Sequence, residues 1–351
     1  MKNIVNLGNV ATYINGYAFK PSDWAEDGTP IIRIQDLTGN SYQMNRFKGI
    51  VDSKYDVNSG DVLISWSASL GVYVWNRGNA VLNQHIFKVV FDKEEVDKDF
   101  FVFQIDNLLK RAANQAHGAT MRHLTKPVFD ALPFYLPDIK TQRLISSKLN
   151  LIVHLIEDHH EQLKKLDELI RSRFIEMFGD LINEPKYPGI KLGSLGVMIT
   201  GGTPSRKHDE YYGGNIPFIS TPCLGSNFIS EKNVQNYLTE AGVKNSATHK
   251  IPPYSLMVGN RVGVGKSSIN TCEMCTNQDI LSFVDIDTSR FDLLFLKKVI
   301  DQYSPYFDEH KRGATIQGVP SKVIKDSMVP DVPLEMQKRY TALVKQSDKS
   351  K

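Results

Sequence analysis

The sequence predicts an α+β protein in which two similar β-rich domains are separated by one long helix. Three observations support this prediction: a length of 351 residues, motifs that recur about 185 to 195 residues apart, and a central segment with heptad spacing. A chain of this length exceeds the size at which a single core usually stops growing, so two domains are expected. The hydrophobic fraction of 41% is sufficient for ordinary folded cores.

Short motifs recur in the same order in the two halves of the chain. The matching pairs are residues 5–8 with 190–193, 15–21 with 200–205, 28–32 with 214–219, 60–65 with 254–258, 83–86 with 277–280, and 118–120 with 313–315. Each copy then closes on a proline-bounded strand and a glutamine, with Pro137 before Gln142 and Pro333 before Gln337. An unchanged order indicates one domain used twice.

Residues 251–268, "IPPYSLMVGNRVGVGKSS", contain two motifs that resemble parts of enzymes. A phosphate-binding P-loop needs a glycine five positions before Gly265, where this chain has Asn260. The Pro-Pro-aromatic box of amine methyltransferases needs an Asn or Asp where this chain has Ile251. The repeat pairs this stretch with residues 57–75, so it is interpreted as a strand, a glycine turn and a second strand.

The central segment 138–178 is expected to be a helix of about 40 residues, roughly 60 Å long. It lies between Pro137 and Gly179, which are typical boundary residues. Apolar positions recur at alternating spacings of four and three, the pattern of a helix that packs along a partner helix. The expected interface residues are Ile145, Leu149, Ile152, Ile156, Leu163, Leu166 and Ile170.

His159 occupies the same heptad register and is expected to be a register-setting or partly exposed core residue. The adjacent pair His159 and His160 does not have metal-ligand spacing on a helix, because neighbouring residues point about 100° apart. Leu155, Leu169 and Phe174 widen the apolar stripe, which predicts more than one partner surface.

Charge, cysteine content and the length of apolar runs limit the other functions that the chain could have. A net charge of +3 permits nucleic-acid binding without requiring it. Three cysteines argue against a disulfide framework, and Cys272 and Cys275 are interpreted as structural thiols. A metal shared with Cys223 or His249, and redox chemistry, remain alternatives for this pair. No apolar run approaches the roughly 18 residues of a membrane span, so a cytoplasmic protein is expected. No metal or cofactor is expected either.

The order of these motifs resembles the specificity subunit of type I restriction-modification systems. Residues 7–37, "LGNVATYINGYAFKPSDWAEDGTPIIRIQDL", are similar to the first-domain opening of that family. Residues 136–149, "LPDIKTQRLISSKL", are similar to its central conserved region, and residues 201–220, "GGTPSRKHDEYYGGNIPFIS", to its second-domain opening. The resemblance extends to about Val344.

This resemblance implies a non-catalytic subunit of a phage-defence complex with no cofactor. Two target recognition domains, at 1–137 and 181–333, would each read half of a split site in double-stranded DNA. A coiled-coil-like spacer helix at 138–180 would hold them about one DNA turn, roughly 34 Å, apart. It would also dock methyltransferase subunits and, through them, the restriction subunit.

The family's second long helix is reduced here to a truncated stub at 334–351. The apolar face of the central helix therefore lacks full cover within the chain, and self-association or a partner subunit is expected to cover it. A protein-interaction scaffold with duplicated β-rich domains is the alternative to DNA recognition.

Basic and amide side chains on loops are the candidate DNA contacts, because Arg and Lys pair with guanine edges and Asn or Gln with adenine. The first-copy candidates are Lys20, Arg33, Arg46, Lys48, Arg77, Arg122 and His123. The second-copy candidates are Ser205, Arg206, Lys207, Arg261, Lys266, Lys311, Arg312 and Gln317. Trp66 and Tyr73 flank a turn and are expected to pack within the hairpin instead of stacking on bases.

Overall fold

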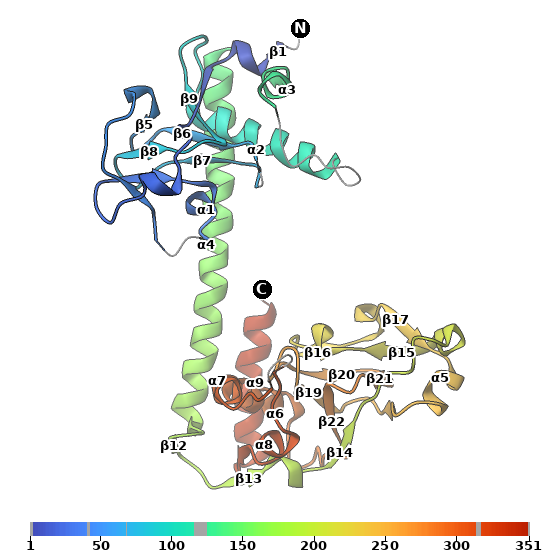
Figure 1. The fold of residues 1–351 in the computed structure, drawn as a ribbon. Helices are drawn as coiled ribbons and strands as arrows, with labels where there is room; N and C mark the ends of the chain where they lie inside the picture. The colour runs from blue at the N-terminus through green and yellow to red at the C-terminus, as the bar shows by residue number, and fades with distance from the viewer. Residues whose placement is uncertain (1–2, 41–42, 68, 116–124, 314–316, 350–351) are drawn as a thin grey trace. The chain divides into compact units, whose positions relative to one another are not determined.

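The computed structural model describes residues 3–40, 43–67, 69–115, 125–313 and 317–349, with only the backbone described at 112–115. The chain divides into two compact units, Met1–Asp158 and His159–Lys351. The division falls within α4 (Ile139–Phe178), a continuous helix of 40 residues (Figure 1). The long helix between two β-rich parts is therefore confirmed.

The two ends of α4 have clear physical causes. The carboxylate of Asp138 accepts hydrogen bonds from the backbone N–H of Thr141 at 3.0 Å and from its hydroxyl at 2.6 Å, which caps the helix start. After Phe178 the chain turns at Gly179, whose φ of 85° lies in the left-handed region that glycine adopts readily.

Unit 1 contains two sheets, ordered β2-β9-β6-β7 and β4-β3-β8-β5, and a β1-β10 pair. The core of the first sheet packs against α2 (Lys98–Gln115) through Ile64, Phe87, Phe101 and Ile105. The strands are β1 (Ile4–Asn6), β2 (Thr12–Asn15), β3 (Thr29–Ile32), β4 (Arg46–Phe47), β5 (Asp56–Val57), β6 (Val62–Ser65), β7 (Gly71–Val74), β8 (Ala80–Leu82), β9 (Ile86–Val90) and β10 (Pro133–Tyr135). The short helices are α1 (Ile34–Leu37) and α3 (Lys126–Asp130).

Unit 2 repeats this topology, with sheets ordered β14-β22-β19-β20-β16 and β17-β15-β21-β18 and a β13-β23 pair. The strands are β11 (Gly179–Asp180), β12 (Glu184–Pro185), β13 (Gly189–Lys191), β14 (Val197–Thr200), β15 (Tyr212–Ile219), β16 (Phe228–Ile229), β17 (Asn236–Leu238), β18 (Lys250–Ile251), β19 (Leu256–Gly259), β20 (Ser267–Asn270), β21 (Met274–Thr276), β22 (Ile280–Val284) and β23 (Met328–Pro330). The helices are α5 (Glu240–Lys244), α6 (Leu293–Gln302), α7 (Ser304–Glu309), α8 (Ser321–Lys325) and α9 (Leu334–Lys349).

The repeat extends to individual strand pairings. The parallel pair β3 and β8 of unit 1 corresponds to the parallel pair β15 and β21 of unit 2. The other strands that the two units share pair antiparallel, as in β6 with β9 and β19 with β22. Unit 2 adds one strand, β16, which pairs parallel with β20. The recurring sequence motifs therefore mark equivalent places in one fold.

The glutamine that ends each copy has the same structural task. The Oε1 atom of Gln142 accepts from the N–H of Asp97 at 2.9 Å, and that of Gln337 accepts from the N–H of Asp292 at 2.9 Å. Both side chains are buried and also donate to two backbone carbonyls. Gln142 thus connects the start of α4 to the start of α2, and Gln337 connects the start of α9 to the start of α6.

The stretch 251–268 forms the expected hairpin. β19 and β20 pair antiparallel, with Val258 opposite Ser267. The turn between them contains Gly263 and Gly265, with φ of 79° and 77°, values that L side chains rarely adopt. These glycines shape a turn, as the repeat predicted.

The short helix α9 packs on the C-terminal end of α4 in unit 2 (Figure 1). The ring centroid of Tyr340 lies 5.3 Å from that of Phe174 and 5.8 Å from that of Phe178. The Tyr340 hydroxyl donates to the carbonyl of Ile170 at 3.4 Å. The stub expected at the end of the chain is therefore a helix that covers part of the apolar face of α4.

The middle of α4 differs from the sequence prediction for His159. All side chains from residue 151 to 160 are exposed, and His159 is among them and not in a core. The heptad pattern predicted that His159 would face a partner helix. Among the described residues, no helix packs against this turn of α4. Ile152 and Ile156 in the same stretch are each 51% exposed.

Candidate nucleic-acid interface

A cavity of about 750 Å³ lies at one end of the larger sheet of unit 2. It is lined by the last residue of β14, Thr200, by the start of the β19–β20 turn, Asn260 and Arg261, and by Gln278 just before β22. Arg312, Gly313 and residues 318–321 line another side. Two arginines and two amides thus face one opening, a set of side chains that can donate and accept hydrogen bonds with base edges.

Close backbone packing fixes the shape of this cavity. The N–H of Val319 donates to the carbonyl of Asn260 at 2.7 Å, and a Cβ on Gly318 would lie 2.6 Å from Cγ of Arg261. Only glycine fits at 318 without moving Arg261. The guanidinium of Arg261 lies 3.8 Å from the carboxylate of Asp279, which favours one orientation of the arginine.

The equivalent end of unit 1 carries different side chains. Trp66 donates from Nε1 to Oδ1 of Asn15 at 3.1 Å, and its ring lies 5.0 Å from that of His85. His85 has a φ of 72°, unusual for a residue other than glycine, and its buried Nδ1 has no hydrogen-bond partner in the described structure. Trp66 also stacks on Phe87 of β9, with 5.6 Å between the ring centroids, so it packs on a neighbouring strand and not within its own hairpin.

The first-copy candidates are dispersed. The side chain of Arg33 is only 18% exposed. It lies 3.6 Å from the buried Asp36 and 5.6 Å from the centre of the Trp24 ring, so unit 1 covers most of it. Arg46 donates to the carbonyl of Gly28, while Lys48 pairs with Asp27 at 3.0 Å. These contacts hold the start of β3 against β4, whereas Arg33 follows the other end of β3.

Two further first-copy candidates, Lys20 and Arg77, lie apart from the others. Lys20 is exposed at the start of a single-turn helix, where its N–H donates to Asp23. Arg77 lies 5.7 Å from the Trp75 ring, in the turn after β7 and so at the end of the sheet away from Trp66. Arg122 and His123 lie outside the described residues.

Second-copy candidates converge in part. Arg261 and Arg312 line the same cavity, whereas Lys311 pairs with Asp308 at 2.6 Å. Ser205, Arg206 and Lys207 are exposed in the loop after β14, and Gln317 is exposed beside Gly318. Lys266 leaves the same turn as Arg261 but lines a different cavity.

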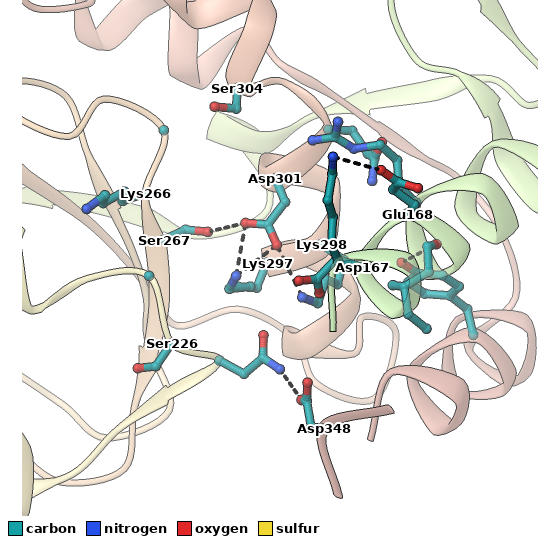
Figure 2. A pocket seen from close by; sticks show the side chains of 18 residues that line it. Asp167, Glu168, Ser226, Lys266, Ser267, Lys297, Lys298, Asp301, Ser304 and Asp348 are labelled. Atoms are coloured by element: carbon teal, nitrogen blue, oxygen red, sulfur yellow. Dashed lines mark hydrogen bonds and ion pairs between the residues drawn. The ribbon is translucent and has the colours of Figure 1, made fainter. Parts of the chain in front are cut away.

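That other cavity, of about 1050 Å³, lies between α4, α6 and α9 within unit 2 (Figure 2). At its base the Asp301 carboxylate accepts from Lys297 at 2.8 Å and from Ser267 at 3.3 Å, and Lys298 lies 3.3 Å away. Burial lowers the pKa of Lys297, an effect that Asp301 opposes. Because Asp301 pairs with Lys297 and Lys298 at the base, and the bordering turn lacks the glycine spacing of a P-loop, this cavity is a poor match for a phosphate site.

The cysteines are free thiols. Burial raises the pKa of Cys275 to about 11 and also raises that of Cys272, which disfavours the reactive thiolate. Across the described parts of the chain, no three His, Cys, Asp or Glu side chains are grouped as metal ligands. In the same parts, no helix is long and apolar enough to cross a membrane.

The expected helix interface lies in three environments. Ile145 packs on the core of unit 1, and Ile170 packs on that of unit 2. Leu149, Leu163 and Leu166 are half-buried, and Leu166 lines an apolar groove between α4 and α9. Ile152 and Ile156 are the most exposed of the set.

Sequence reasoning did not select Asn15, Gln84, Asn260 and Gln278 as candidate readers. Gln84 and Gln278 belong to the Asn-Gln motif that recurs in both copies, so the signal was present. It was interpreted only as evidence of repetition. The turn and loop geometry that gathers these amides is visible only in the folded chain.

The fold defines a protein built from two copies of one β-rich module on a long helix. Residues 2–168 and 187–351 both match the family model for the type I restriction modification DNA specificity domain. The chain therefore belongs to this type I restriction-modification specificity family, as its motifs suggested.

Two curated relatives show the degree of similarity. The type I restriction enzyme EcoBI specificity subunit of Escherichia coli is 25% identical over 170 residues, which cover 48% of this chain and 35% of the relative. The MjaIX specificity subunit of Methanocaldococcus jannaschii is 26% identical over 155 residues, covering 44% and 36% respectively. The matched region thus spans about a third of the length of each relative.

Solved structures share the fold over almost the whole chain. A chain from a study of complex assembly and conformational transition in a type I R-M system has a TM-score of 0.62 at 15% identity, covering 99% of this chain and 90% of its own. The S subunit of a type I system from M. genitalium has a TM-score of 0.55 at 12% identity, covering 100% and 90%. At these identities the likeness establishes the fold.

Proposed function

We propose that this chain is the DNA-recognition subunit of a type I restriction-modification complex. Each β-rich unit reads one half of a bipartite target in double-stranded DNA. The main support is the arrangement at the end of the unit 2 sheet, where Arg261, Arg312, Asn260 and Gln278 line one cavity. These are the side-chain types that discriminate bases in the major groove.

The chain is proposed to carry no catalysis of its own. Neither the P-loop-like turn nor the Pro-Pro-Tyr stretch has the residues its enzyme class requires, and both belong to a structural hairpin. Methyl transfer and cleavage would therefore come from partner subunits. The isolated chain is expected to transfer no methyl group to DNA, and transfer without an added partner would contradict this assignment.

The partner surface is proposed to lie on α4. Exposed aliphatic side chains between Leu151 and Ile156 form an apolar stretch that water solvates poorly. Methyltransferase subunits, and through them the restriction subunit, would dock there. In their absence the stretch would favour self-association of the free chain.

A salt titration on random duplex DNA tests the DNA-binding part of this proposal. Binding that neutralises phosphates makes the logarithm of affinity fall linearly with the logarithm of salt concentration. The full chain, alone and with methyltransferase subunits, is expected to show such a slope. A chain with no measurable duplex binding in either form would favour a protein-interaction scaffold instead.

A further inference from the structure

Equivalent loops of the two units have the same backbone geometry. A Cβ on Gly16 would lie 2.0 Å from the carbonyl oxygen of Asn83, and one on Gly201 would lie 2.2 Å from that of Asn277. The N–H groups of these glycines donate to equivalent positions of β9 and β22 at 3.1 and 3.2 Å. The chain therefore follows the same close approach in both units.

A second pair of equivalent hydrogen bonds joins the β6–β7 hairpin of unit 1 and the β19–β20 hairpin of unit 2 to the loops beside them. The N–H of Trp66 donates to the carbonyl of His85 at 3.3 Å, and the N–H of Asn260 donates to that of Asp279 at 3.0 Å. Residues can therefore be compared by position as well as by motif. The pairs are Asn15 with Thr200, Trp66 with Asn260, Ser67 with Arg261, Gln84 with Gln278, and His85 with Asp279.

Four of these five positions differ in chemistry, and one is the same. Both units have a glutamine at the shared position. At the other four positions unit 1 has Asn, Trp, Ser and His, where unit 2 has Thr, Asn, Arg and Asp. A constant frame with exchanged side chains is the arrangement expected where two modules read different bases.

In unit 2, Arg261 is placed to act as a directed donor. Its side chain is 57% exposed, whereas the side chain of Asp279, 3.8 Å away, is only 15% exposed. Gly318 packs against the aliphatic stem, and the guanidinium borders the cavity. A fixed planar guanidinium suits the two acceptors, O6 and N7, that guanine presents in the major groove.

In unit 1 the same position is Ser67, and none of the five compared positions of this unit is an Arg, Lys, Asp or Glu. The Oδ1 atom of Asn15 is occupied by Trp66, which leaves the amide N–H groups of Asn15 as donors. Gln84 brings a second amide from the shared position. Amide side chains pair with the N6 and N7 edge of adenine.

His85 adds evidence that this end of unit 1 is specialised. A φ of 72° at a residue with a Cβ costs free energy, and its buried Nδ1 lacks a hydrogen-bond partner in the described structure. Such strain is retained where the surroundings impose it, and it often accompanies function.

We propose that Arg261, oriented by Asp279, reads a guanine in the half-site of unit 2, and that unit 1 reads an A·T pair at the equivalent place through Gln84 and Asn15. This assignment rests on the proposed function, because it names the bases that the two units distinguish. Arg261 would contact DNA directly, whereas Asp279 is a positioning residue.

The test is a binding array of duplexes that carry single-base changes across the sequence selected by the unchanged full chain. Arg261→Lys keeps the positive charge but loses the planar fork, so guanine preference at one position should fall at least about fivefold. The salt dependence of binding should stay unchanged, because the net charge is unchanged. Asp279→Asn should reduce preference at the same position, and Gln84→Leu at an A·T pair of the other half-site.

Lys232→Gln provides the matched control, because Lys232 is an exposed cation that does not line the cavity. It should leave base preference unchanged. If Arg261→Lys keeps full guanine preference, or weakens all sequences equally, the guanine assignment is overturned. An unchanged A·T preference in Gln84→Leu would overturn the unit 1 assignment. If the unchanged chain selects no sequence at all, the proposed function itself fails, which is a separate outcome.

Discussion

The side-chain amide of Gln337 joins three backbone segments of unit 2. It accepts from the N–H of Asp292 and donates to the carbonyls of Arg290 and Val332, at 2.9 to 3.0 Å. Gln142 makes the corresponding contacts in unit 1. Because the side chain of Gln337 is fully buried, each of its partners would lose its hydrogen bond if the amide were removed.

Replacing Gln337 by Leu should therefore destabilise unit 2 by about 3 kcal/mol or more, since each buried polar group left unpaired costs about 1–3 kcal/mol. Urea unfolding, with hydrogen exchange at the start of α6 as a local probe, measures the effect. Gln235→Leu, at an exposed position, is the control and should change stability by about 0.5 kcal/mol or less. Equal stability of the two variants would refute this role.

Residue roles on the surface were harder to predict than residue roles in the core. Arg33 and Arg261 both follow a strand, and both were predicted to contact DNA. Folding places Arg33 beside the buried Asp36 and leaves Arg261 largely exposed at a cavity. The partner of Arg33 lies three residues away, whereas Asp279 and Gly318 reach Arg261 from distant parts of the chain, so only the environment of Arg33 is partly encoded locally.

At the scale of elements, α4 follows directly from its sequence. The heptad spacing, Pro137 and Gly179 predicted a helix at 138–178, and the helix spans Ile139–Phe178. The helices α2 and α6 were not predicted, because the motifs that recur in each copy mark strands and turns. What covers α4 also could not be predicted, since covering depends on packing between distant segments such as α9.

The exposed middle of α4 predicts opposite effects for two similar substitutions. Ile156→Glu should leave both units folded, because the side chain is 51% exposed, yet should abolish self-association and methyltransferase docking. Ile145→Glu should instead destabilise unit 1, because Ile145 packs on its core and a charge there would lose its hydration. Sedimentation velocity with and without methyltransferase subunits, combined with thermal unfolding, distinguishes the two.

A well-behaved monomer of the unchanged chain over a wide concentration range would contradict the expected self-association. Unimpaired docking of methyltransferase subunits to Ile156→Glu would place the partner surface elsewhere. Leu163→Glu extends the test toward unit 2, where the side chain is half-buried.

At the scale of the whole molecule, duplication was the most predictable property. Motif order alone identified the equivalent strands, and the matched hydrogen bonds of Gly16 and Gly201 agree with it. The interface was less predictable, because reading groups lie on loops whose side chains differ between the copies. The repeat identified where the units correspond, and the structure identified how they differ.

Two units that read separate half-sites of one DNA target should select a split sequence. Selection of duplexes from a random library by the full chain, assembled with methyltransferase subunits, measures this directly. The expected result is two short specified blocks separated by a constant number of unspecified base pairs, with centres about one helical turn, roughly 10 base pairs, apart. Enrichment of one uninterrupted block, or of no sequence, would contradict it.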